Sequence, residues 1–530
     1  MMTRAWLLAT FAVAVSGSTV FAQAPAQPRV GLAPGLETAL TLDEVVARVL
    51  EQNPSIQAAR IDRESAEFGV QAARGLFDPR ITADGSYERR VTPVSSSLGG
   101  VADGKLREHS LIFAPTIAGL IPWGGGTYAT TFSSSRTTTN SAFVPLTPQY
   151  PAFWTFSFAQ PVVRNRDLDE GRRQLRVAQA TRALTDAQFR QQVTDIVTAA
   201  AMTYWDLAYA IENLDIQQDG LVEAREHVSG NRRLADQGLL SEVEVVEAQS
   251  QVAFFEGAIA AAEEAVTRTE NALKALMLAN RASPLWQHAV RPVTPPGATP
   301  VTMSVEDAVR AALASRPERA TLDRSVDINA IDTQFYRGQA RPQIDLIGSY
   351  TLQGLAGQPV PPQASLPGFP ASQVPSYLVG GYPTSLGTLV ARDFPVAHVG
   401  LRLSLPIWNR TAEAGVAMTL AAGRRLQLQR AQLDQTIEVD VRNAMQSLRS
   451  VEAQLAAAAA GRAAAQQQYE SEERRLENGL STVYLLFERH SALVGARGRE
   501  NQARIQLSKT ILEFERVTGT TLERRGIRTP

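Results

Sequence analysis

The 530-residue chain contains no cysteine, which excludes disulfides, thiolate metal sites and cysteine nucleophiles. Its 52 basic and 53 acidic residues almost cancel, so the composition does not point to nucleic acid as a partner. The five histidines are scattered without metal-ligand spacing, and no Ser/His/Asp constellation is visible. We therefore expect no catalytic site, no metal and no cofactor, and a function that is not enzymatic.

Long apolar runs are also missing beyond the N-terminus. The opening MMTRAWLLATFAVAVSGSTVFAQA has a basic residue, an apolar core and a small-residue end, the layout of a secretory signal peptide over residues 1–22. The alternative is an apolar N-terminal anchor. Residues 23–39 are interpreted as an N-terminal linker. Since no later run reaches 18 apolar residues, no transmembrane helix is predicted, and an exported chain could be soluble or span as a β-barrel.

The sequence contains one unit written twice. LTLDEVVARVLEQNP (40–54) returns as MSVEDAVRAALASRP (303–317), and GLFDPRITADGSY (75–87) as GQARPQIDLIGSY (338–350). FSFAQPVVRN resembles LRLSLPIWNR, which aligns Pro161 with Pro406, and a later pair aligns Gly238 with Gly479. We therefore predict two repeats, 40–281 and 303–518. A Pro-rich linker separates them (282–302), and a C-terminal tail follows (519–530).

Each repeat carries segments with the two-residue period of β-strands, at 81–88, 127–140 and 153–163 in the first and at 342–353 and 396–408 in the second. Strands of about ten residues with aromatic residues near their ends suit a thin bilayer-spanning barrel, and a small soluble sheet is the alternative. The expected membrane-interface aromatics are Tyr87, Trp154, Phe156 and Tyr350. The stretch 111–135 has no counterpart in the second repeat and could extend the strands or form a flap.

Long helices with heptad-spaced apolar residues follow the strands, which indicates coiled-coil packing. Gly238 and Gly479 should end these helices as left-handed caps, and Ser241 with Glu244 forms a capping box for the next helix. Each glycine then marks the tip of a helical hairpin. Apolar residues exposed at a tip favour a docking surface. Its candidate residues are Gly238, Leu239, Leu240, Ser241, Gly479, Leu480, Ser481 and Thr482.

With these features the chain, from about Leu40 to Thr518, resembles the outer membrane factors, the TolC-like exit ducts. The most specific parts are the two Gly-Leu tips, the duplication and the strand-to-helix turns AQPVVRN and SLPIWNR, with Pro161, Asn165, Pro406 and Asn409. The resemblance implies a mainly α fold with a β-barrel segment. Three chains would share one 12-stranded outer-membrane barrel, continued by a periplasmic α-helical barrel. Four strands per chain are too few to close alone, because about eight are required.

The resemblance also implies a passive exit duct of a tripartite efflux pump or type I secretion system, in the outer membrane with its helices in the periplasm. Its partners would be a periplasmic adaptor (membrane fusion protein), an inner-membrane pump of RND, ABC or MFS type, outer-membrane lipid and two further copies. The tips would meet the adaptor, and Glu244 and Glu488 would be gate acids. Leu485 stands where the family places another acid. The alternative is a soluble periplasmic coiled-coil scaffold or adaptor, which would not need the alternating strands.

Overall fold

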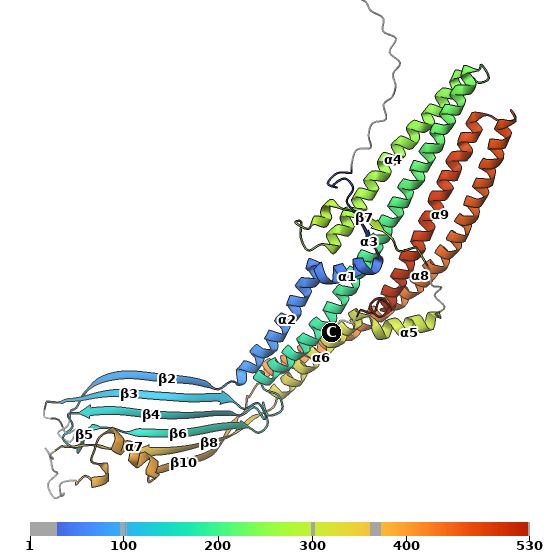
Figure 1. Cartoon of the computed structure of the whole chain (residues 1–530). Helices are drawn as coiled ribbons and strands as arrows, with labels where there is room; N and C mark the ends of the chain where they lie inside the picture. The colour runs from blue at the N-terminus through green and yellow to red at the C-terminus, as the bar shows by residue number, and fades with distance from the viewer. Residues whose placement is uncertain (1–28, 96–100, 102, 298–302, 361–372, 528–530) are drawn as a thin grey trace, which may run out of the picture. The chain divides into compact units, whose positions relative to one another are not determined.

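The computed structural model describes residues 29–95, 101, 103–297, 303–360 and 373–527 (Figure 1). The predicted signal peptide lies outside this range. The chain divides into two compact units. The hairpin unit comprises Met1–Val49, Ala200–Gly297 and Glu452–Lys509, and the sheet unit comprises Leu50–Ala199, Ala298–Val451 and Thr510–Pro530. Three long helices, α3 (Glu170–Asp236), α8 (Arg410–Glu477) and α9 (Val483–Thr518), contribute residues to both units.

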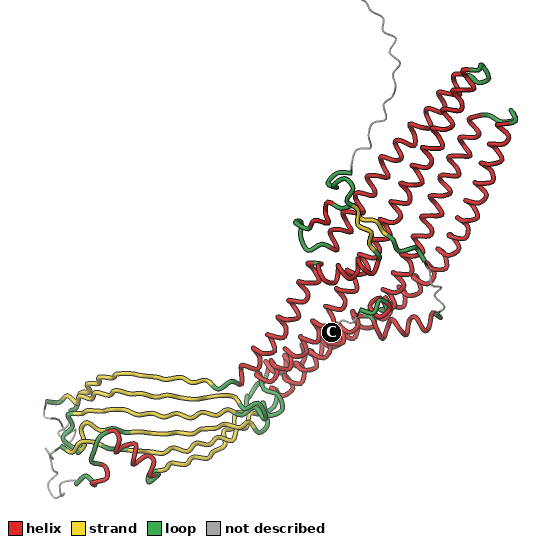
Figure 2. Tube along the Cα trace, viewed as in Figure 1, coloured by secondary structure: helices red, strands yellow, loops and turns green. Residues whose placement is uncertain are grey.

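Six long antiparallel strands form the main sheet of the sheet unit, in the order β10-β8-β6-β4-β3-β2 among the described residues (Figures 1 and 2). Two short strands, β5 and β9, pair with each other beside it, and β5 also pairs with β4. The long strands are β2 (Arg80–Pro93), β3 (Lys105–Leu120), β4 (Thr127–Thr139), β6 (Ala152–Pro161), β8 (Gln343–Gly354) and β10 (Pro395–Ser404); the short ones are β5 (Leu146–Gln149) and β9 (Gly357–Pro359). The stretch 111–135, whose role the sequence left open, extends this sheet through β3 and β4.

A short helix, α7 (Tyr382–Ala391), preceded by the 3₁₀ turn η4 (Ser376–Leu378), lies against β6 and β8. Leu389 packs there with Ala152 and Leu352. Gly354 permits this approach, because a Cβ at that position would lie 2.3 Å from the Ser385 carbonyl oxygen.

The helices of the sheet unit include α2 (Pro54–Arg74), the 3₁₀ turn η1 (Gly75–Phe77), α5 (Val305–Ser315), α6 (Pro317–Gln339) and α10 (Thr521–Arg524). Their core packs α5 against α8 and α9 through Ala308, Ala312, Ile437, Val441 and Phe514. The aligned prolines Pro54 and Pro317 each start a new helix, so the helical path is broken at the same place in both repeats.

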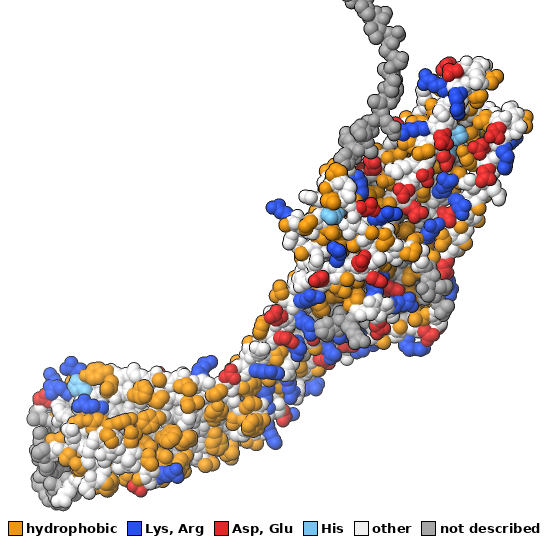
Figure 3. All heavy atoms as spheres, viewed as in Figure 1, with side chains coloured by type: hydrophobic (Ala, Val, Ile, Leu, Met, Phe, Trp, Pro, Cys, Tyr) orange, Lys and Arg blue, Asp and Glu red, His pale blue; other side chains and the backbone are white. Residues whose placement is uncertain are grey.

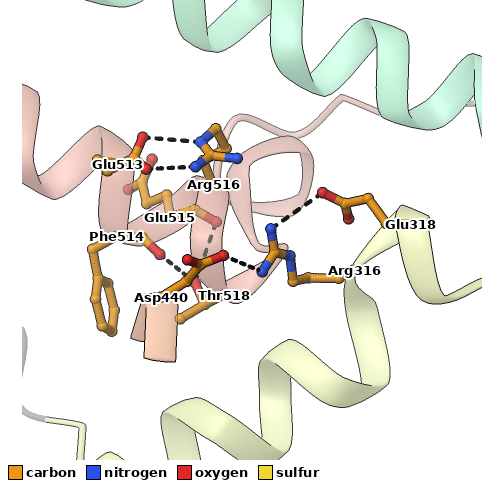
Figure 4. Close-up of polar contacts among 8 residues, drawn as sticks. All are labelled: Arg316, Glu318, Asp440, Glu513, Phe514, Glu515, Arg516 and Thr518. Atoms are coloured by element: carbon orange, nitrogen blue, oxygen red, sulfur yellow. Dashed lines mark hydrogen bonds and ion pairs between the residues drawn. The ribbon is translucent and has the colours of Figure 1, made fainter. Parts of the chain in front are cut away.

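The α5–α6 break is held by a buried guanidinium (Figure 4). Arg316 Nη1 donates to Asp440 Oδ2 at 2.9 Å, and its Nη2 donates to Glu318 Oε1 at 3.2 Å. On α9 nearby, Arg516 pairs with Glu513. A buried charge is tolerated only when paired, so these contacts anchor the helix break to α8.

The hairpin unit contains α4 (Glu242–Met277), the 3₁₀ turn η3 (Pro284–Gln287) and most of α1 (Leu42–Gln52). Two short strands, β1 (Glu37–Leu40) and β7 (Ala289–Pro292), pair in parallel. The segments expected to be linkers, 23–39 and 282–302, therefore contribute paired strands. The buried Tyr204 hydroxyl ties them to α3, since it donates to the Leu40 carbonyl at 3.1 Å and accepts from the Thr294 amide at 2.9 Å.

Candidate functional site: hairpin tips and a two-faced sheet

Both hairpin tips have the predicted glycine cap. Gly238 and Gly479 adopt φ values of +72° and +71°. Leu239 N donates to the Leu234 carbonyl at 2.9 Å, and Leu480 N donates to the Arg475 carbonyl at 2.8 Å, the long hydrogen bond of a Schellman motif. A left-handed residue without a Cβ is needed at these positions, so local sequence alone specifies where each long helix ends.

A hydroxyl side chain caps the helix that follows each turn, as predicted for Ser241. The Ser241 hydroxyl accepts from Val243 N at 3.2 Å, and Ser241 N donates to Glu244 Oε2 at 2.9 Å, completing a capping box. Thr482 Oγ1 accepts from Leu485 N at 3.4 Å. Ser481 instead donates its hydroxyl to Glu472 Oε1. One carboxylate oxygen of the candidate gate acid Glu244 thus accepts from the Ser241 amide, whereas Glu488 is exposed.

The apolar tip residues differ in exposure. Leu239 is 70% exposed and Leu480 is 73% exposed, as expected for a docking surface. Leu240 was expected to be exposed with them, but it is partly buried against Ala248 and Phe487. That cluster contains residues of α4 and α9, so it packs the two hairpins together just behind their tips.

A buried polar cluster lies between the hairpins, which the sequence had not revealed. His490 is fully buried, and its Nε2 lies 2.7 Å from Glu223 Oε2. His490, with Arg497 nearby, holds the pKa of Glu223 below its usual range despite burial. Burial lowers the pKa of His227, whose Nε2 lies 3.2 Å from the Tyr469 hydroxyl. Burial also raises the pKa of Tyr469 to about 12. These residues are far apart in sequence, and only packing of the hairpins unites them.

The two strand-to-helix turns meet at one residue, through its side chain and its backbone carbonyl. Gln339, the last residue of α6, donates from Nε2 to Asn165 Oδ1 at 2.6 Å, and its carbonyl accepts from Asn409 Nδ2 at 3.1 Å. Asn165 has φ +66°, and its carbonyl accepts from Arg172 at 2.7 Å. The duplicated asparagines are therefore brought together, although Gln339 itself was not predicted. Pro161 closes β6, and Pro406 is exposed between β10 and α8.

The sheet has two chemically distinct faces. Directly opposed residues of an antiparallel pair point to the same side, and Phe156 opposes Tyr350 while Trp154 opposes Leu352. Continuing the register through β4 and β3 places Tyr87 on this side as well. All four expected interface aromatics thus share one face, and Figure 3 shows hydrophobic side chains gathered over the strands.

The opposite face of the same strands is rich in threonine and serine. Thr155 and Thr351 hydroxyls lie 3.0 Å apart across β6 and β8, and those of Thr116 and Thr131 lie 3.0 Å apart across β3 and β4. An apolar face opposite a Thr/Ser-rich face is what a membrane wall around an aqueous lumen requires. In the described part of the chain, no helix has the length and apolarity to cross a membrane.

Comparison with known proteins agrees with this arrangement. Residues 166–277, which include α3 and α4, match the family model for outer membrane efflux proteins. The chain also has the fold of outer-membrane channels. It superposes on the Campylobacter jejuni CmeC outer membrane channel (TM-score 0.62, 14% identity, 91% of this chain and 86% of that one). It superposes equally on the outer-membrane channel OprN (TM-score 0.62, 14%, 96% and 98%) and nearly as well on VceC from Vibrio cholerae (TM-score 0.59, 15%, 90% and 96%).

The resemblance to outer membrane efflux proteins drawn from the sequence is therefore confirmed, as is the mainly helical fold with a strand segment. This is a family of transport channels. A comparison with curated protein sequences finds no match.

Proposed function

We propose that this chain is the outer-membrane exit duct of a tripartite efflux pump or a type I secretion system. The observation that carries the proposal is the sheet with one apolar and one Thr/Ser-rich face. Three chains would assemble into one barrel in the outer membrane, with the helices in the periplasm. Transport would be passive, and an inner-membrane pump would supply the energy. We propose the same division of the chain as the sequence predicts: two repeats, the linker between them and the C-terminal tail.

The sheet supplies the decisive test. A charge placed on a lipid-facing position of a membrane strand costs about 2–4 kcal/mol at the bilayer midplane, while lumen positions tolerate it. Phe156→Lys should reduce the protein recovered from the outer membrane as an assembly of about three times the 57.4 kDa chain mass, less the signal peptides. The matched control Ser157→Lys, on the other face of the same strand, should not.

The competing function, a soluble periplasmic scaffold or adaptor, makes the opposite prediction. Both lysine variants would then be tolerated, and the parent chain would be recovered from the periplasm as a monomer or dimer. That result would exclude the duct.

The hairpin tips are the proposed contact with a periplasmic adaptor. Leu239 and Leu480 present exposed apolar side chains at glycine-capped turns. Leu239→Asp combined with Leu480→Asp should abolish co-purification of the adaptor while leaving the trimer intact. Val222→Asp, at another exposed apolar position of the hairpin unit, is the control and should leave adaptor binding unchanged.

The exposed Glu488 is the proposed gate acid. Three copies of this carboxylate around a closed periplasmic end would concentrate negative potential and favour cations. Glu488→Gln should reduce the cation preference of single channels measured in planar bilayers. Glu244→Gln should have a smaller effect, since the Glu244 carboxylate is held in the capping box.

A further inference from the structure

The sheet contains six strands long enough to cross a bilayer, two more than the four per chain expected from the sequence. β3 is 16 residues long and β4 is 13, against 10 for β6 and 12 for β8. About 9–11 residues suffice to cross a bilayer. β3 pairs with β2 over the whole of β2, from Arg80 opposite Ala118 to Pro93 opposite Lys105. β3 and β4 lie between β2 and β6 in the middle of the sheet, where a separate flap would not form ladder hydrogen bonds.

The hairpin of β3 and β4 carries the same types of side chain on its two faces as the neighbouring strands do. On β3, Leu111 (58% exposed) and Phe113 (54% exposed) lie on the face that holds Trp154 and Phe156. On the opposite face of β3, the Ser110 hydroxyl lies 3.2 Å from that of Thr137 on β4. Large apolar side chains left exposed on one face only are expected if that face meets lipid.

The apolar band on these strands also has a defined end. Beyond Tyr87 and Leu111, the same face carries Arg89 and His109, and Arg136 lies directly opposite Leu111. Charged residues are expected where a strand leaves the hydrocarbon layer and enters the headgroups. β2, β3 and β4 therefore show a membrane-spanning segment followed by a polar rim.

The two edges of the sheet require partners. β2 and β10 are the terminal strands, and every residue of β2 is exposed. Unpaired backbone amides and carbonyls are costly inside a bilayer, so open edges do not occur there. An antiparallel path of six strands leaves its two ends running in opposite directions. β2 of one copy can therefore pair antiparallel with β10 of the next, which closes a ring of identical chains.

We propose that each chain contributes six strands to the membrane wall, so that three copies form an 18-stranded barrel. This inference rests on the proposed function, namely a trimeric duct. Barrel diameter grows roughly linearly with strand number. With a strand spacing of about 4.8 Å and a tilt of about 40°, the backbone diameter rises from about 24 Å for 12 strands to about 36 Å for 18. The outer-membrane part of this duct is thus about 1.5 times wider than a 12-stranded wall.

The absence of cysteine provides a clean background for testing this wall. Single-cysteine variants would be reconstituted in lipid nanodiscs and treated with a membrane-impermeant maleimide. Phe113→Cys and Thr116→Cys report the two faces of β3, and Phe156→Cys and Thr155→Cys report the two faces of β6 as matched controls. If β3 is in the wall, Phe113→Cys should label roughly tenfold more slowly than Thr116→Cys, as Phe156→Cys does relative to Thr155→Cys, because lipid excludes the reagent.

The outcomes separate the inference from the proposed function. Protection of Phe156→Cys with free labelling of Phe113→Cys would leave the duct intact and overturn the six-strand wall. Free labelling at both positions would show that the sheet does not face lipid and would overturn both. Electron microscopy of the unsubstituted chain in nanodiscs provides a measurement that needs no variant. A count of 18 strands supports the inference, and a count of 12 refutes it.

Discussion

Removal of the Glu270 carboxylate should lower the local stability of the segment that joins the two repeats. Glu270 is 2% exposed and Lys274 is fully buried, and Lys274 Nζ lies 2.6 Å from Glu270 Oε1. The second carboxylate oxygen accepts from Arg29 at 2.7 Å, and Val290 N donates to Glu270 at 3.3 Å. One carboxylate therefore joins α4, the segment before β1, and β7.

The magnitude follows from what the substitution leaves behind. In Glu270→Ala, the buried Lys274 ammonium would retain, among the described residues, the Trp286 carbonyl 3.1 Å away as its hydrogen-bond acceptor. Breaking a buried ion pair by removing one partner costs about 3–5 kcal/mol, because an uncompensated charge stays in the interior. Replacing both charges with apolar residues, as in Glu270→Leu with Lys274→Met, removes that penalty and should cost far less.

Hydrogen exchange is the suitable assay, because a chain of this size with two units is not expected to unfold in one step. Protection of peptides covering β7 should fall by the equivalent of about 3–5 kcal/mol in Glu270→Ala and recover in the double variant. Glu256→Ala, which breaks the exposed pair with Arg225, should cost less than about 1 kcal/mol. If Glu270→Ala loses no more protection than Glu256→Ala, the reasoning about the buried pair is wrong.

Three further predictions concern the tips, the turns and the hairpin core. Gly479→Ala should destabilise its tip by about 1–2 kcal/mol, because φ is +71° there. The control Gly461→Ala should stabilise α8, because a Cβ at that helical position meets open space. Hydrogen exchange of the two variants distinguishes the effects. Gln339→Ala removes the side-chain partner of Asn165 and of Arg164, while the backbone carbonyl that accepts from Asn409 is kept. It should lower the thermal midpoint more than an exposed Gln→Ala change elsewhere. Burial lowers the pKa of His227, so below about pH 6.5 the unfolded chain binds a proton that the folded chain resists, and stability should fall as pH drops. His227→Gln should flatten that thermal-midpoint profile, and an unchanged slope would contradict the assignment.

The sequence predicted features whose signals are local. The tip glycines and the Ser241 cap each depend on a few neighbouring residues, and both are present. The strand β6 was recognisable because Trp154 and Phe156 alternate with small hydroxyl residues. Strand period, glycine caps and X-Pro breaks act over one turn or a few residues, so they can be recognised without knowing the partners.

Features that depend on distant pairing could not be predicted in this way. β1 and β7 are four residues each, too short for a period, and they pair across about 250 residues of chain. Leu240 was expected to be exposed because its neighbours are, but packing between α4 and α9 covers it. His490 and Glu223 showed no ligand spacing because their contact exists only once the hairpins pack together.

The duplicated helix break shows how far a repeat determines structure. In the first repeat, Asn53 precedes the proline and caps α2, since its side chain accepts from Ser55 N and Ile56 N. In the second repeat, Arg316 occupies the matching position and forms no side-chain cap; its buried guanidinium pairs with Asp440 instead. The proline fixes where the chain bends in both copies, because the preceding residue is excluded from the helical region. What holds the bend has diverged from a local cap to a long-range ion pair. Copies of one unit can therefore keep the same path while the contacts that stabilise it differ.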